Sequence, residues 1–146
     1  MDNKLKSKTR LAAIQLVSQQ LVNNQDIELI KDEFDKYYRN SIIDENLEKI
    51  QYNVNFLSEL IIYFKTVDFV SLSKDINAII KFERQFEKWD IVNQAIIMIA
   101  ISEIRNSKKN KTKIILNDYI EISKSFVSIK ETKLINSILD KLINEK

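Results

Sequence analysis

The chain has 146 residues, of which 45% are hydrophobic and 30% charged, and its formal net charge is +2. This is the composition of one globular domain, long enough to bury a core without disulfides or metals. Glycine, proline, cysteine and histidine are all absent. Without cysteine and histidine, thiolate chemistry and the usual general base are excluded. Because tight hairpin turns rely on glycine, its absence favours an all-α fold.

The first predicted helix covers residues 4–23, where apolar side chains recur at i, i+3 and i+4. Arg10 lies on the continuation of this stripe, and we expect it to project past the edge of the core. Positive charge gathers at the start of the helix, on Lys4, Lys6, Lys8 and Arg10. Two interpretations are open: a solvated basic tail, or a site where cations and helix amides hold an anion such as a chain of phosphates.

Three further helices are predicted before residue 90 by the same periodicity, over residues 26–39, 44–64 and 71–88. The long middle one is expected to start at a capping signal in residues 41–44.

Residues 91–104 form the segment around which the others must pack. No polar side chain occurs between residues 95 and 101, so a helix here is apolar around nearly its whole circumference. Such a helix belongs in the centre of a bundle, and it is shorter than the roughly 20 apolar residues of a membrane span. Asp90 is placed to cap its start, and Asn106 suits its end.

A polar, basic linker at residues 106–113 separates this segment from two last helices, predicted over 112–126 and 128–143. Ser128 and Glu131 have the spacing of a capping box at the start of the final helix. Asn136 lies among apolar neighbours there, and we expect its amide to face the interior. No repeat or domain boundary is visible, so residues 1–146 are predicted to form a single domain.

Several blocks of the sequence follow patterns that are typical of one known protein family. KIILNDYIEISKSF (113–126) is similar to the family pattern K-V-A-I-N-E-A-[IV]-E-L-A-K-x-[FY]. After a short loop, SIKETKLINSILD (128–140) contains a match to the next family pattern, K-F-V-N-G-[VI]-L-D, with Lys133, Asn136 and Asp140 in register. RLAAIQ (10–15) resembles R-x-x-A-[VL]-Q, and AIIMIAISE (95–103) resembles A-[IV]-L-R-[IL]-A-x-x-E. Together these blocks resemble the NusB family of bacterial transcription antitermination factors. The resemblance implies an all-α fold of two packed helical subdomains.

The resemblance also implies a function without catalysis. Proteins of this kind bind the boxA element of nascent ribosomal RNA leaders, jointly with the small-subunit ribosomal protein NusE, in an antitermination complex with RNA polymerase. It implies a cytoplasmic protein with no membrane association, no metal and no cofactor. Whether the chain is a monomer or a homodimer stays open.

Carried over residue by residue, the resemblance implies an RNA surface in two parts. The first is the start of the first helix, with Lys6, Lys8, Arg10 and Gln15, to which Lys4 of the same cluster is added. The second is the last inter-helix loop, with Phe126, Lys130 and Lys133. Phe126 fits a core position as well as a base contact, and Lys130 occupies an acidic position of the family.

The face that meets NusE is implied to include Glu87 and Asn93, the latter at a position that is acidic in the family. Two alternatives remain. The chain has only four arginines, which leaves open a helical interaction bundle without RNA binding. NusB-like domains also occur fused to RNA cytosine methyltransferases, but this sequence has no glycine-rich cofactor loop and no catalytic constellation.

Overall fold

The computed structural model describes residues 1–40, 52–80 and 84–144. Within these ranges the chain forms seven α-helices, two short 3-10 turns and no strand, which confirms the all-α prediction. The helices are α1 (Asn3–Asn23), α2 (Ile27–Asn40), α3 (Val54–Phe64), α4 (Phe69–Ile80), α5 (Ile91–Arg105), α6 (Thr112–Ser123) and α7 (Ile129–Asn144). The 3-10 turns are η1 (Phe86–Lys88) and η2 (Lys109–Lys111).

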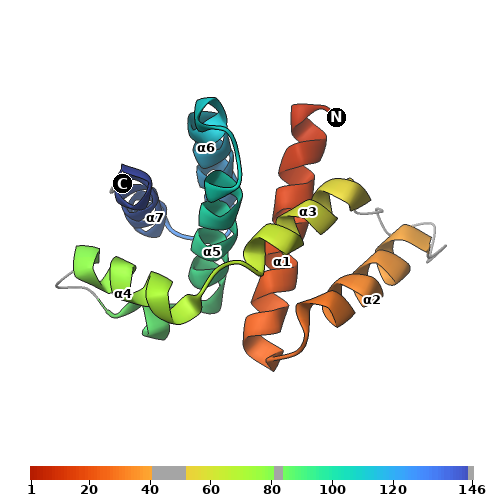
Figure 1. The fold of residues 1–146 in the computed structure, drawn as a ribbon, viewed down its shortest axis with the longest axis horizontal. Helices are drawn as coiled ribbons and strands as arrows, with labels where there is room; N and C mark the ends of the chain where they lie inside the picture. The colour runs from red at the N-terminus through yellow and green to blue at the C-terminus, as the bar shows by residue number, and fades with distance from the viewer. Residues whose placement is uncertain (41–51, 81–83, 145–146) are drawn as a thin grey trace.

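The helices pack in two groups that meet along α5. The first group is α1, α2 and α3, and the second is α4, α6 and α7 with α5 itself (Figure 1). α5 contacts α1 and α3 on one side and α6 and α7 on the other. This arrangement confirms the prediction of two packed helical subdomains.

α5 is the buried centre that the sequence predicts. Every side chain from Asn93 to Ile104 is buried, including the polar residues at 93, 94, 102 and 103. A helix with apolar side chains on all sides gains most by touching neighbours all round, which is why both groups of helices pack on it. In the part of the chain that the structure describes, no helix has both the length and the apolarity needed to cross a bilayer.

Asparagine ends helices where glycine is unavailable. Asn24 closes α1 in the left-handed conformation, with φ of 53°, and its N–H donates to the carbonyl of Gln20 at 2.8 Å. Asn106 closes α5, and its side-chain amide donates to the Ser102 carbonyl at 2.7 Å. At the other end of α5, Asp90 occupies the predicted N-cap position, but its side chain makes no capping hydrogen bond.

Two predicted helices are shorter in the structure. α3 begins at Val54, where the Asn53 side chain accepts the Phe56 N–H, so the prediction of one helix over 44–64 is wrong at residues 52–53. The capping signal in residues 41–44 lies outside the described residues. α4 ends at Ile80, and residues 84–85 are not helical, so the predicted helix over 71–88 is also too long.

Asn136 does not face the interior. The buried face of α7 consists of Ile135, Ile138, Leu139 and Leu142, at i, i+3, i+4 and i+7 spacing. Asn136 is one position, or about 100°, further round the helix and is exposed. The expectation of a buried amide is therefore wrong, since flanking apolar residues do not place a side chain on their own face of a helix.

Replacing Ile97 with alanine should test the role of α5 as the core. Ile97 has no exposed surface, so Ile97→Ala leaves a cavity and should lower the free energy of unfolding by about 2–5 kcal/mol. Ile62→Ala is the matched control, because Ile62 is 58% exposed on α3. Urea denaturation of both variants measures the difference. A loss below about 1 kcal/mol for Ile97→Ala would contradict the assignment of α5 as the core.

Candidate functional site

The N-terminal turn of α1 carries the basic cluster and is capped by an acid. Asp2 is the N-cap, and its carboxylate accepts the Leu5 N–H at 2.7 Å. Its carbonyl accepts the Lys6 N–H at 3.1 Å. Because these amides already have acceptors, an anion at this end would be held mainly by lysine side chains and less by the helix terminus.

The predicted RNA-contacting residues of α1 do not share one environment. Lys4, Lys8 and Gln15 are exposed, and their spacing of four and seven residues places them on one face of the helix. Lys6 is half-buried and lies on a different side. Arg10 is buried.

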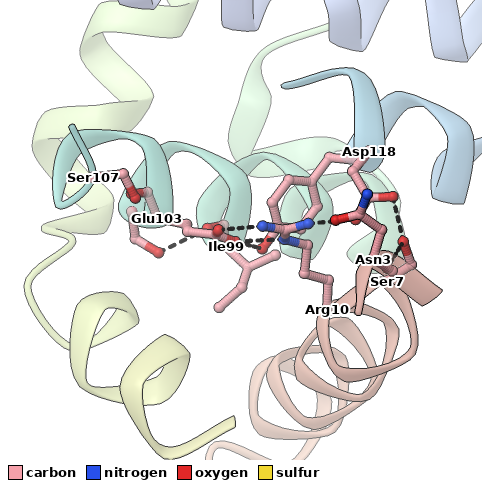
Figure 2. A network of polar contacts seen from close by, with 9 residues as sticks. Asn3, Ser7, Arg10, Ile99, Glu103, Ser107 and Asp118 are labelled. Carbon is pink, nitrogen blue, oxygen red and sulfur yellow. Dashed lines mark hydrogen bonds and ion pairs between the residues drawn. The ribbon is translucent and has the colours of Figure 1, made fainter. Parts of the chain in front are cut away.

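The expectation that Arg10 projects past the core is wrong, because Arg10 is only 5% exposed. Its guanidinium makes a two-pronged contact with Glu103 of α5, from Nε to Oε1 at 2.9 Å and from Nη2 to Oε2 at 2.7 Å. Nη1 donates to Oδ2 of Asp118 on α6 at 2.6 Å (Figure 2). Arg10 therefore joins three helices, and a fork of this kind suits arginine better than lysine.

Two hydroxyls complete this network. Tyr119 donates to Oε1 of Glu103 at 2.6 Å, and Ser7 donates to Oδ1 of Asp118 at 2.6 Å. Ser7 and Arg10 both lie on α1, so the two oxygens of Asp118 hold successive turns of the basic helix against α6 (Figure 2). We call Ser7, Arg10, Glu103, Asp118 and Tyr119 the Arg10 network.

α3 contributes an aromatic wall to the same network. Thr9 accepts the Asn53 N–H at 2.9 Å and donates to the Leu5 carbonyl at 2.7 Å. Asn53 in turn caps α3 through the N–H of Phe56, whose ring centroid lies 5.4 Å from the Arg10 guanidinium carbon. The Tyr119 ring lies at 5.6 Å, so the cation has two aromatic neighbours as well as its carboxylates.

These contacts change the proton affinities of the buried groups. Burial alone would lower the pKa of Arg10, but the hydrogen bonds and negative charge of Glu103, with Asp118, raise it above its ordinary value. Burial, followed by the charge and hydrogen bond of Glu103, raises the pKa of Tyr119 well above 10.0. Arg10 is therefore a permanent cation and Tyr119 a permanent hydrogen-bond donor at neutral pH.

Sequence reasoning missed the partners of Arg10, although a signal was present. Arg10 continues a buried stripe, and Glu103 ends a segment that is otherwise apolar. Two opposite charges on buried faces are stable only when they pair, so each charge is a signal for the other. Asp118 and Tyr119 carried no such signal, because their positions on α6 became adjacent to Arg10 only in the packed fold.

The last inter-helix loop presents the second part of the predicted RNA surface. Phe126 is 46% exposed, so it is not a core residue. Lys130 and Lys133 are both exposed on the first turns of α7. Ile129, beside them, is 77% exposed, and the loop therefore offers apolar and cationic groups together.

The two predicted partner-binding residues differ in exposure. Glu87 is exposed and accepts a hydrogen bond from the Asn77 amide at 2.8 Å. Asn93 is 8% exposed, and its amide nitrogen donates to Oε2 of Glu131 at 2.6 Å. Glu131 also closes the predicted capping box, since its N–H donates to the Ser128 hydroxyl at 3.1 Å.

Fold and surfaces together define an all-α, two-subdomain protein whose basic first helix is joined to the core helix and to α6 by the ion pairs of Arg10. Residues 7–144 match the NusB family. Similar curated proteins include the transcription antitermination protein NusB of Rickettsia bellii, 29% identical over 144 residues, covering 96% of this chain and 90% of that protein. That of Rickettsia rickettsii is 27% identical, with 96% and 92% covered. That of Blochmanniella floridana is 31% identical over 110 residues, with 73% and 78% covered. The chain belongs to the NusB family.

Removing the Arg10 side chain should be costly. Arg10→Ala leaves Glu103 buried without its counter-ion, and loss of one partner from a buried pair typically costs about 3–5 kcal/mol. Arg105→Ala is the matched control, because Arg105 is exposed on the same helix as Glu103. Chemical denaturation compares the two. Equal stability of both variants would contradict the structural role of the Arg10 network.

The raised pKa of Tyr119 predicts an alkaline limit to stability. An unfolded tyrosine ionises near pH 10, whereas folded Tyr119 stays protonated, so its stabilising effect is complete below about pH 10 and falls as the pH rises further. The ultraviolet absorbance of tyrosinate follows ionisation of the five tyrosines. We expect one to ionise only with unfolding, and Tyr119→Phe to remove that step. Identical late titration in the variant would refute the assignment.

Proposed function

We propose that this protein is a non-enzymatic antitermination factor that binds boxA-like single-stranded RNA together with NusE, in the antitermination complex with RNA polymerase. The observation that carries this proposal is the match to the NusB family over residues 7–144, combined with a basic first helix held rigidly on the core.

The lysines of α1 support the RNA-binding part of the proposal. Lys4 and Lys8 share one exposed face with Gln15, which could donate or accept hydrogen bonds beside a phosphate chain. Lys6 adds a third cation at the same end. Arg10 is given a different role from its neighbours: its donors are engaged by carboxylates, so it positions α1 and does not itself contact RNA.

The α6–α7 loop supports a second RNA contact. Ser7 of α1 contacts Asp118 of α6. α6 ends about 8 Å beyond Asp118, at about 1.5 Å per residue. A single RNA strand could therefore contact the α1 lysines and the loop together. We assign Phe126 to stacking on a base and Lys130 and Lys133 to phosphates.

The partner-binding part of the proposal rests on Glu87 and Asn93. Glu87 offers an exposed carboxylate on η1, and Asn93 lines a surface cavity at the start of α5. These residues are far along the chain from the α1 lysines, and they lie near the opposite end of α5 from Glu103. NusE and RNA could therefore bind at the same time.

The RNA surface is tested by salt dependence. Each phosphate neutralised on single-stranded RNA contributes roughly −0.7 to the slope of log K against log salt, so replacing Lys4, Lys6 and Lys8 by alanine should flatten the slope by about 2. Filter binding of boxA-like RNA measures it. The fold should be unaffected, because none of the three is buried.

The charge-matched control replaces three exposed lysines elsewhere, Lys36, Lys74 and Lys141, by alanine. It removes the same net charge and should change the slope far less. An unchanged slope in the α1 variant would show that the cluster is a solvated tail. Retained NusE binding without any RNA binding would favour the interaction-only alternative.

A further inference from the structure

The connection between α5 and α6 carries a second run of positive charge, separate from the lysines of α1. No acidic residue occurs between positions 103 and 118. The whole chain has a net charge of only +2, so the rest of the chain is net negative. We call the five basic residues of this run the connector cations: Arg105, Lys108, Lys109, Lys111 and Lys113.

The described parts of the fold do not neutralise the connector cations. All five are exposed, and none makes an ion pair within residues 1–40, 52–80 and 84–144. Other lysines do, such as Lys31, which pairs with a carboxylate on α2. The two carboxylates nearest to the run in sequence, Glu103 and Asp118, are both bound by Arg10. The charge of the connector cations is therefore available to another molecule.

The start of α6 makes this concentration of charge unfavourable in the free protein. α1 begins at Asp2, whose carboxylate accepts a backbone N–H of the first turn. α6 instead has Lys111 at its N-cap position, and no side chain caps it. Cations at the positive end of a helix dipole raise the free energy of the folded state, and they repel one another. A bound anion would offset both effects.

The structure brings part of this run together around a cavity of about 260 Å³. Its polar lining contains two cations, two hydroxyls and no carboxylate: Arg105, Ser107, Lys109 and Thr112. The rest of the lining is apolar and comes from α5 and α7. The Ser107 hydroxyl already donates to the Glu103 carbonyl at 2.7 Å, whereas the Thr112 hydroxyl has no hydrogen-bond partner among the described residues. Two cations and a free hydroxyl donor around one cavity suit an oxyanion such as phosphate.

The connector cations lie at the same end of the molecule as the basic start of α1 (Figure 1). Ser7 and Arg10 of α1 both contact Asp118, which is six positions after Thr112 on α6. A strand that binds the α1 lysines can therefore continue onto the connector. A protein partner fits less well, because protein interfaces usually centre on aromatic anchors and residues 105–118 contain no aromatic side chain.

We propose that the connector cations bind phosphates of the RNA that flanks the boxA-like element, with one phosphate at the cavity between Arg105 and Lys109, hydrogen-bonded to Thr112. Lysines separated by asparagine, serine and threonine suit contacts to the RNA backbone, which position a strand and carry no base sequence. The inference rests on the proposed function only in naming the neighbouring part of the strand.

The test compares a boxA-like RNA with the same RNA extended by about ten uridines, in turn at the 5′ end and at the 3′ end. Filter binding to the full chain over a salt series gives the slope of log K against log salt. Each phosphate neutralised contributes roughly −0.7, so about three further contacts should steepen the slope by about 2 for at least one extension. An unchanged slope with both extensions overturns the proposal.

Three variants show where the extension binds. The connector variant, which should lose the steeper slope but bind the short RNA as before, carries alanine at Lys108, Lys109 and Lys111. The control, which should keep the steeper slope, carries alanine at three exposed lysines elsewhere: Lys36, Lys74 and Lys88. The α1 variant without Lys4, Lys6 and Lys8 should bind the short RNA less tightly and still gain from the extension. A steeper slope retained by the connector variant overturns the proposal.

Thr112 tests the placement of one phosphate at the cavity. Thr112→Val keeps the shape of the side chain without its hydroxyl, and it should weaken binding of the extended RNA by about tenfold, because a hydrogen bond to a charged group is lost. Thr112→Ser keeps the hydroxyl and should bind normally. Denaturation curves confirm that both variants are folded. Normal binding of the extended RNA by Thr112→Val refutes the phosphate site at the cavity.

Oligouridylate without the boxA-like element separates this inference from the proposed function. Binding of oligouridylate that requires the connector cations, with no preference for boxA-like RNA, refutes the boxA part of the proposed function and supports the connector contact. A preference for boxA-like RNA with no gain from either extension has the opposite meaning. Tighter binding of polyglutamate than of oligouridylate of equal length, lost in the connector variant, would identify an acidic protein as the partner and overturn the proposal.

Discussion

The buried ion pair between Arg10 and Glu103 is the interaction on which the rest of the structure depends. It joins the first helix to the core helix, and Asp118 extends it to α6, so one guanidinium connects both subdomains. Such a network is not a large net source of stability, because desolvation of the charges offsets much of their attraction. Its effect is specificity: a different packing of α1 on α5 would leave a buried charge without a partner.

This constraint explains how a nearly neutral protein can present a basic surface. The net charge is only +2, so a basic surface must come from where the cations lie and not from how many there are. Arg10 is held inside by carboxylates, whereas Lys4 and Lys8 are exposed on the same helix. The Ser7 contact with Asp118 fixes the turn that carries Lys4 and Lys8. A stable direction for these side chains reduces the ordering needed when a phosphate chain binds.

α5 uses polar groups at both ends for different purposes. At its C-terminal end Glu103 is fully engaged inside the fold, by Arg10 and Tyr119. At its N-terminal end Asn93 binds Glu131 but keeps one buried acceptor unused. Buried polar atoms without partners are uncommon in folded proteins. Glu103 therefore connects α5 to α1 and α6, and Asn93 connects it to α7.

The sequence by itself determined the all-α class, the central position of α5 and the capping box of α7, because these follow from periodicity and local hydrogen bonding along one segment. It also located the basic cluster and the family. Only the tertiary structure decided which of those cations are exposed. Arg10 and Lys8 are two residues apart in one charged run, yet one is buried and the other exposed. The difference depends on Glu103 and Asp118, about a hundred residues further along the chain, and the spacing of charges within α1 contains no information about them. The same holds for Asn93, whose role is set by Glu131 across the α5–α7 contact.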